Sequence, residues 1–471
     1  MLRFILFSPS FCADADVAGI LSSGWSSNSQ PERLTARLFR GQLMNNKRAS
    51  LHSLLSLCLI FFLIASACRK SDDSKHLTLA VVSGVEGDAL KAAAREYQQQ
   101  TGTHIEVAEF PYANLFEKAM IDLNSATGAY DLIMMDDPWF PRFASHLSDL
   151  APFYQRRNLA VDDDFVPTSI ALGRHPYETG ALYALPYVGN SQLFFYRKDI
   201  FEKHNLREPA TWNEVLTAAK TISEGEQTGA RGGGRLYGYV MRAAQGNAVV
   251  ADFLPIFWAF GAEMFDPEGK PVVNSAEGIA ALKFMLELGK HAPPGYVSFN
   301  ADEVSAHLLQ GTAAMSINWP AWISAFGDES KSKVIGKMAI TVMPGASRSG
   351  QAEIGNWLVA IPESAKNGDA AFDFLVWATS MEQMKKSALR GNPPTRRSVF
   401  KDSELIAKFP SYPAQLRSLE TSRPRPRTPF WNEIENTFGI FLSKANSGEL
   451  SAEEAMNQAN AEIAKILERN R

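Results

Sequence analysis

The sequence predicts an α/β fold built on a parallel sheet with helices on its faces, and two observations carry this prediction. Residues 77–135 alternate short apolar strands with helices in the order βαβαβ, and short loops between them demand a parallel sheet with right-handed crossovers. The last strand then ends abruptly in two carboxylates, a proline and a tryptophan, within the segment YDLIMMDDPWF at residues 130–140. Open α/β sheets bind their ligands at this carboxyl edge.

Each element of this pattern has its own signal. The predicted strands are short apolar runs, which are typical of strands buried on both faces of a parallel sheet. The first helix is rich in alanine and ends before Gly102, a residue that suits the left-handed position after a helix. The predicted elements are strands at 77–82, 105–110 and 131–135 and helices at 88–100 and 114–125.

Asp136, Asp137 and Trp139 follow the third strand directly and form the central candidate site. Carboxylates accept hydrogen bonds from hydroxyl groups, and a flat indole covers the CH face of a sugar ring. The combination therefore favours a carbohydrate ligand. A helix N-cap beside a core tryptophan is the structural alternative for the same residues.

Three further candidates come from the loops that follow the first and second strands. The loop at 83–87 should open on the same edge of the sheet, which makes Ser83 and Glu86 candidate ligand contacts. Its glycine spacing matches neither a dinucleotide-binding loop nor a P-loop. Tyr112, after the second strand, is a candidate for stacking on a ligand, and a core or turn position is equally open.

The second half of the chain repeats the arrangement of a strand followed by tryptophan. Residues 184–198 are strand-like on both sides of Gly189 and Asn190, an interruption that indicates a hinge or a close approach to a ligand. Further on, a strand predicted at 312–318 is followed by Trp319. Two such edges that face each other would form a cleft with aromatic side chains on both sides.

Other segments of the second half have local signals. Thr211 with Glu214, three residues on, is a capping box that starts a helix, and Asn300 caps a second helix that Gly311 ends. Residues 236–241 are predicted as a strand after a glycine turn at 232–234. The aromatic residues of 252–263 recur at helical spacing, which indicates core positions, and Trp258 is the one candidate among them to line a cleft.

Two charged segments are predicted to be solvated. Residues 423–427 alternate arginine with proline and are predicted as an extended loop, with a docking patch for a partner as the alternative. The acidic run at 162–164 is predicted as a solvated face or a helix start.

The amino-terminal region has the pattern of an export signal. Residues 44–67 combine a basic start, an apolar run too short for a relaxed membrane span, and small residues before Cys68. This resembles a bacterial lipobox, with Cys68 as the lipidated first residue of the mature protein, and a short hydrophobic anchor is the alternative. We expect Met44 to be the true start, 1–43 to be a mis-annotated upstream extension, and 68–75 to be a polar tether.

Composition narrows the function classes. The chain has 471 residues, of which 45% are hydrophobic and 21% are charged, and its net charge of −4 gives no reason to expect nucleic acid. Three cysteines, Cys12, Cys58 and Cys68, lie in the first 68 residues, so no cysteine-based metal or redox site is predicted. No motif of a serine hydrolase or zinc protease occurs, and no cofactor is expected.

From residue 77 to the end, the chain resembles the extracellular solute-binding proteins of the maltose-binding type, the substrate receptors of carbohydrate ABC importers. The segments that carry the resemblance are the lipobox, YDLIMMDDPWF, LPYVGNSQLFFYRKDIFEKHNL with TWNE, LLQGTAAMSINWPAW, GNWLVAIPESAKNGDAAFDFLVWAT and NPPTRRSVF. The resemblance implies a two-lobed periplasmic binding protein fold. Each lobe would be a mainly parallel sheet flanked by helices, with the ligand cleft between the lobes at the hinge.

The resemblance also implies boundaries and site residues. The first lobe would comprise 76–187 and 357–402, and the second 188–356 and 403–471. Positions where such proteins often contact sugar are Asp136, Asp137, Asn190, Trp258, Trp319, Asn356, Trp357, Arg397 and, more loosely, Trp431; Trp139, Glu86 and Tyr112 complete the candidate set.

The implied function is capture of a sugar or oligosaccharide and its delivery to the permease subunits of an ABC importer, without catalysis. The protein would be an exported monomer, held at a bacterial membrane by the lipid on Cys68. A polyol, a sugar phosphate or a polyamine is an alternative ligand, and a phosphate would need Arg397 in the cleft. Glycoside hydrolysis would need two carboxylates across a scissile bond, whereas neighbouring Asp136 and Asp137 on an extended segment point apart.

Overall fold

The structure is a computed structural model that describes residues 76–225 and 235–470. The predictions for 1–75, including Cys68, and for the glycine turn at 232–234 concern residues outside this range. The strands are β1 (His76–Val82), β2 (His104–Phe110), β3 (Leu132–Asp136), β4 (Arg174–His175), β5 (Ala181–Leu182), β6 (Ala184–Val188), β7 (Leu193–Arg197), β8 (Met315–Asn318), β9 (Met338–Thr341) and β10 (Trp357–Ala360).

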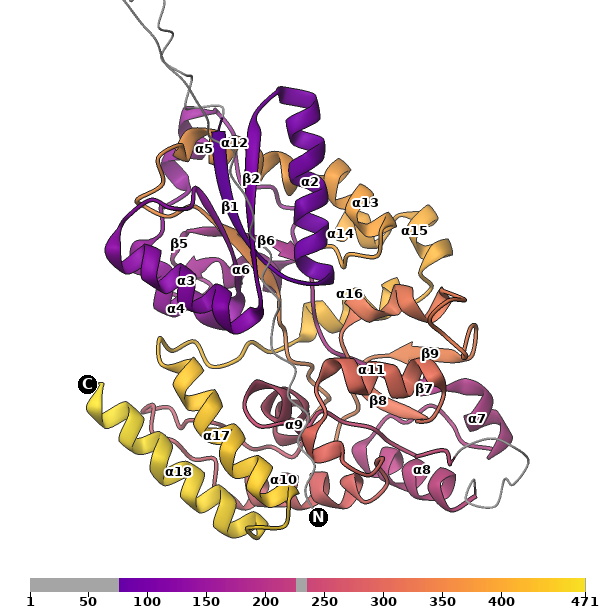
Figure 1. The fold of residues 1–471 in the computed structure, drawn as a ribbon. Coiled ribbons are helices and arrows are strands. Elements are labelled where there is room, and N and C mark those ends of the chain that lie inside the picture. Colours follow the sequence, from indigo (N-terminus) through magenta and orange to yellow (C-terminus); the bar gives the residue numbers. More distant parts are fainter. Residues whose placement is uncertain (1–75, 226–234, 471) are drawn as a thin grey trace, which may run out of the picture. The chain divides into compact units, whose positions relative to one another are not determined.

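Helices cover both halves of the described chain (Figure 1). They are α2 (Val85–Thr101), α3 (Tyr112–Ser125), α4 (Phe140–Phe143), α5 (Ala151–Arg156), α6 (Pro167–Leu172), α7 (Lys198–Lys203), α8 (Trp212–Gly225), α9 (Asn247–Ala259), α10 (Ala276–Gly289), α11 (Ala301–Gln310), α12 (Gly368–Ala378), α13 (Met381–Leu389), α14 (Arg397–Phe400), α15 (Ser403–Lys408), α16 (Tyr412–Thr421), α17 (Trp431–Asn446) and α18 (Ala452–Arg469).

The larger sheet has the strand order β2-β1-β3-β10-β6. β1 pairs in parallel with both β2 and β3, so the predicted βαβαβ unit is confirmed. β10 enters from far along the chain and runs antiparallel to β3 and β6 on either side. Its register places Trp357 directly opposite Asp136, and opposite residues of paired strands project to the same face.

The three-stranded sheet, called the smaller sheet from here on, differs from its prediction. Its order is β8-β7-β9, and β7 is antiparallel to both neighbours, whereas a mainly parallel sheet was expected. The crossover rule applies only within a compact βαβ unit, whereas α7 to α11 separate β7 from β8. The predicted strand at 236–241 is wrong as well. This buried segment forms only one isolated bridge, from Tyr237 to Ala313, so its apolar character reflects burial rather than ladder pairing.

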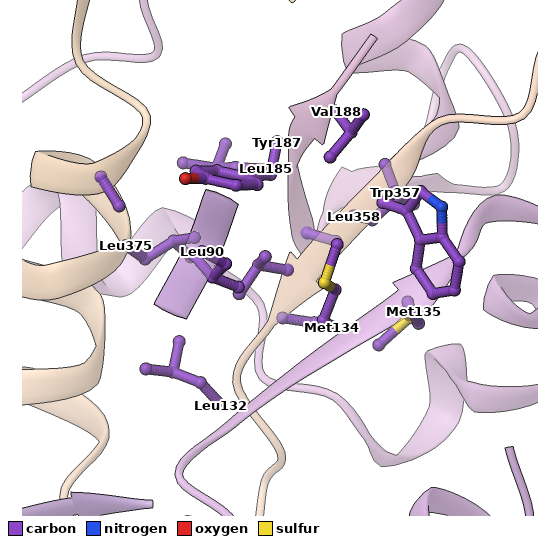
Figure 2. Packing of buried hydrophobic residues seen from close by; sticks show 14 of the residues in the cluster. Leu90, Leu132, Met134, Met135, Leu185, Tyr187, Val188, Trp357, Leu358 and Leu375 are labelled. Atoms are coloured by element: carbon purple, nitrogen blue, oxygen red, sulfur yellow. The ribbon is translucent and has the colours of Figure 1, made fainter. Parts of the chain in front are cut away.

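Two large hydrophobic clusters fill the described chain. The first contains β1, β3, β6 and β10 with α2 and α12, and Figure 2 shows Leu90, Leu185, Leu358 and Leu375 among its side chains. The second surrounds α9 and contains α8, α10, α17 and α18. The helices α15 and α16, which follow the predicted boundary at 402, also contribute side chains to the first cluster.

The predicted helix caps are confirmed. Asn300 and Glu303 form a reciprocal capping box, and Gly311 ends that helix in the left-handed conformation. The Glu214 side chain accepts a hydrogen bond from the Thr211 amide at 2.9 Å. Capping depends on residues within one turn, which is why it can be predicted from sequence.

Replacing Gly189 by alanine is expected to lower the free energy of unfolding by about 1–3 kcal/mol, the usual cost of overpacking. A Cβ at this position would lie 1.9 Å from the backbone oxygen of Pro394, and a backbone atom cannot easily move aside. The glycine between β6 and β7 is thus required by close backbone packing. Urea denaturation would measure the loss, and Gly327→Ala, where a Cβ meets nothing within 4 Å, is the matched control. Equal stability of the two variants would contradict the packing explanation.

Candidate functional site

A cavity of about 590 Å³ collects seven of the predicted ligand-binding residues. They are Ser83, Glu86, Tyr112, Asp136, Asn190, Trp319 and Trp357. They come from the carboxyl edge of the larger sheet, the segment between β6 and β7, and the end of β8. A larger cavity of about 800 Å³, lined by residues such as Phe326, Met338 and Phe409, contains none of the predicted residues. The 590 Å³ cavity is therefore the candidate solute site.

Asp136 is the best-defined hydrogen-bond acceptor of this cavity. It ends β3, is only 6% exposed, and accepts a hydrogen bond from the Tyr112 hydroxyl to Oδ2 at 2.8 Å. The Nη2 group of Arg425 donates to its other oxygen, Oδ1, also at 2.8 Å. Each carboxylate oxygen has two lone pairs, so both retain capacity to accept a hydrogen bond from a molecule in the cavity.

Glu86 and Asn190 form a second polar pair. The Asn190 amide donates to Glu86 Oε1 at 3.3 Å, and the amide oxygen of Asn190 is buried without a hydrogen-bond partner. Burial raises the pKa of Glu86, and the nearby charge of Asp136 acts in the same direction. A buried oxygen without a partner is costly, and a hydroxyl group in the cavity could satisfy it.

The aromatic residues divide into those that line the cavity and those that support it. Trp357 and Tyr112 line the wall, and the Trp139 ring lies behind both, with ring centroids 5.8 Å and 4.8 Å away. Trp139 is 1% exposed and is not among the lining residues, so the prediction that it contacts ligand is corrected to a packing role. Figure 2 shows the Trp357 indole beside Met135, one strand away.

Five other candidates do not line this cavity. Asp137, Asn356 and Trp431 are fully buried in the surrounding structure. Trp258 lines a separate cavity of about 230 Å³, where the Arg423 guanidinium lies 5.0 Å from its ring. Arg397 begins α14 and lies 3.6 Å from Glu420. Periodicity and strand ends do not distinguish a wall residue from the layer behind it, and the structure corrects these placements.

The two guanidinium groups of the cavity wall, Arg242 and Arg425, were missed by the sequence analysis. Arg242 is 3% exposed and donates through Nε to Asp252 at 2.6 Å, and its guanidinium lies 5.4 Å from the Trp319 ring. The signal in the sequence that could have revealed Arg242 was Asp252. A carboxylate inside an apolar helix must be neutralised or paired with a cation.

Residues 423–427 also differ from their prediction as a solvated segment, whereas the acidic run at 162–164 keeps Asp162 and Asp163 exposed, as predicted. Arg425 is 3% exposed, and its ion pairs place it in the interior. Asp162 and Asp164 pair with the buried Arg396. Charged residues are rarely buried unless paired, and the partners in both cases lie more than two hundred positions away in sequence.

Carboxylates outnumber cations beneath the cavity floor. Burial raises the pKa of Glu353 to about 8 and that of Glu435 to about 7, while the positive charge of Arg425 opposes both shifts. Burial likewise raises the pKa of Asp137 to about 6 against the opposing charge of Arg425. At neutral pH, Glu353 therefore holds a proton and adds no negative charge to the site.

Within 76–225 and 235–470, no group of three or more His, Cys, Asp and Glu side chains is arranged to hold a metal ion. In the same range, every helix is too short or too polar to cross a membrane.

Comparison with known proteins identifies the family. Residues 83–385 match the model of the bacterial extracellular solute-binding proteins. A Sinorhizobium fredii protein, named as a probable amino-acid ABC transporter periplasmic-binding protein, is 28% identical over 76% of this chain and 80% of its own length.

Two solved structures share the two-lobed fold. A solute-binding protein from Agrobacterium radiobacter K84 in complex with ribitol has a TM-score of 0.76 at 28% identity, covering 83% of this chain and 98% of its own. Maltose-bound MalE3 of T. maritima has a TM-score of 0.75 at 26% identity, covering 83% and 99%. The predicted family and fold are confirmed, and the chain belongs to the bacterial extracellular solute-binding proteins.

Proposed function

We propose that this protein captures a neutral, hydroxyl-rich solute, a polyol or a sugar, and delivers it to an ABC importer. The observation that carries the proposal is the excess of hydrogen-bond acceptors in the cavity wall. Asp136, Glu86, the Tyr112 oxygen and the unpartnered oxygen of Asn190 all accept hydrogen bonds. A hydroxyl group can donate to each of them, and it can also accept from Arg242 or Arg425.

The aromatic residues support the same solute class. Trp319, which follows β8 of the smaller sheet, and Trp357, which begins β10 of the larger sheet, line the cavity beside polar groups. Indole faces bury the CH surface of a sugar or polyol and leave its hydroxyl groups to the polar residues. The ribitol and maltose complexes of the two structural relatives agree with this assignment.

The charges of the wall argue against the two ionic alternatives. A sugar phosphate needs free cations, but Arg425 is already paired with Asp136 and Asp137, and Arg397 lies elsewhere. A polyamine needs free carboxylates, but Asp136 is already paired with Arg425. A neutral solute needs neither a free cation nor a free carboxylate in the cavity wall.

We propose that the two lobes have the boundaries implied by the resemblance, except that 403–421 joins the first lobe. The chain would act as a monomeric receptor without catalytic activity, and lobe closure about the crossing segments would enclose the solute, a motion typical of periplasmic binding proteins. We propose export through 44–67 and a lipid on Cys68. Mass spectrometry of the mature amino terminus would detect a diacylglyceryl-modified Cys68, and an unmodified cysteine would contradict the anchor.

Thermal unfolding of the purified protein with a panel of pentitols, hexitols, sugars, sugar phosphates, amino acids and polyamines would test the proposal. A solute that binds only the folded state, at about a hundred times its dissociation constant, should stabilise the protein by roughly 2.7 kcal/mol. We expect this for a neutral polyol or sugar that is recovered unchanged. Stabilisation by amino acids or polyamines alone would overturn the solute class, and cleavage of the solute would indicate an enzyme.

A further inference from the structure

Residues 423–427 form the last segment that links the two hydrophobic clusters. Every second residue of this segment is an arginine that contacts a distant part of the fold. The segment reads RPRPR from Arg423 to Arg427, and proline at every second position fixes the backbone φ angle. Arg423 pairs with Glu263, whereas Arg427 donates to the backbone oxygen of Leu172 at 2.8 Å. The central arginine, Arg425, lies between these two attachments and lines the solute cavity.

Arg425 joins the cavity wall to the structure beneath it. Its Nη2 group donates to Asp136 Oδ1 at 2.8 Å and to Asp137 Oδ1 at 2.7 Å, which uses both hydrogens of that nitrogen. Its Nε lies 3.4 Å from Glu353 Oε1. Arg425 is 3% exposed, and Asp137 and Glu353 are fully buried, so water cannot substitute for these contacts.

These contacts fix the orientation of the Asp136 carboxylate. With Arg425 on Oδ1 and the Tyr112 hydroxyl on Oδ2, the carboxylate is held from both sides. The remaining lone pairs are then oriented by the guanidinium rather than by the solute. Fixing an acceptor before binding removes the cost of ordering it during binding.

We infer that Arg425 is the positioning residue of the solute site, which holds the Asp136 carboxylate in the orientation that accepts solute hydroxyls. This inference rests on the proposed function. It deepens that function by naming the residue that sets its specificity for neutral solutes. Because Asp136 and Asp137 already neutralise Arg425, the guanidinium organises acceptors and does not recruit an anion.

Lysine cannot replace arginine here. A guanidinium directs donors along several fixed axes, whereas an ammonium group is a single point charge on a flexible stem. Arg425→Lys retains the positive charge but cannot hold Asp136 and Asp137 while also reaching Glu353. The effect of this variant therefore separates geometry from charge.

A double-mutant cycle between Arg425→Lys and Asp136→Asn tests the inference by titration calorimetry with ribitol and maltose as probes. We expect each single change to weaken binding at least about tenfold, and the double variant to be much less impaired than the product of the two, because coupled residues are non-additive. Arg423→Lys, outside the cavity, is the matched control, with an expected change below about twofold.

The outcomes separate the two proposals. Binding by the wild type with a coupled loss supports the positioning role. Binding that survives Arg425→Lys, or losses that multiply independently, overturns the positioning role and leaves the receptor function intact. A wild type that binds neither probe nor any other polyol or sugar overturns the proposed function and the inference with it. If Arg425→Lys fails to fold, the paired variant R425Q/D137N, which removes the buried cation together with one of its buried carboxylate partners, takes its place in the cycle.

Discussion

Asp252→Asn is expected to lower the free energy of unfolding by about 3 kcal/mol, because breaking a buried ion pair leaves the remaining charge uncompensated. Asp252 is 1% exposed and accepts from Arg242 Nε at 2.6 Å and from the Arg242 backbone amide at 2.8 Å. Asparagine preserves the shape of the side chain but removes the negative charge that neutralises Arg242. Urea denaturation at constant pH would measure the difference.

The same variant should also weaken solute binding about tenfold or more, which corresponds to roughly 1.4 kcal/mol. Arg242 lines the cavity over Trp319, and Asp252 fixes its position there. Glu263→Gln is the matched control, since Glu263 pairs with Arg348 and Arg423 but is one-third exposed. Exposed pairs contribute less than about 1 kcal/mol. A similarly small loss in Asp252→Asn would show that Arg242 has other neutralising partners.

Glu353→Gln is expected to flatten the dependence of stability on pH. Burial raises the pKa of Glu353 from an ordinary value of 4.5 to about 8, so the folded protein keeps a proton that the unfolded chain has released. The wild type should therefore lose stability as pH rises from about 5 to 8, by roughly 3–5 kcal/mol from this residue. Glutamine keeps the shape without a titrating proton. The variant should match the wild type near pH 5 and exceed it above pH 8.

The groups that act on Glu353 are Arg425 and Arg242, which favour its charged form, and Glu435 and Asp136, which oppose it. The raised pKa of Glu435, about 7, adds a slope of the same sign that should survive in Glu353→Gln. Glu462→Gln, an exposed change in α18, is the control and should keep the wild-type slope. Parallel pH profiles for the wild type and Glu353→Gln would mean that Glu353 is already ionised in the folded protein.

Local signals predicted the first half of the larger sheet well. β1, α2, β2, α3 and β3 lie within a few residues of their predicted bounds, because strand and helix periodicities and helix ends depend on near neighbours in sequence. The same reasoning placed Asp136, Asn190 and Trp319 at the cavity, since strand ends and chain interruptions mark the edges where ligands bind.

Long-range partners explain what was missed. Arg425 reaches Asp136 across 289 positions, and Arg242 became recognisable only through Asp252 on the neighbouring helix. Trp139 and Trp357 look alike as residues at strand ends, yet one is packed behind the other. The antiparallel smaller sheet likewise depends on how a long helical excursion returns to β7.

The sequence by itself determined the family and the order of elements in the βαβαβ unit of the larger sheet, because these follow from local periodicity and from segments that are recognisable as they stand. Only the tertiary structure decided which aromatic rings line the cavity and which arginines neutralise its carboxylates. The physical reason is that burial and ion pairing are properties of contacts between distant segments. A buried charge is stable only beside its partner, and no local pattern of residues specifies where that partner lies.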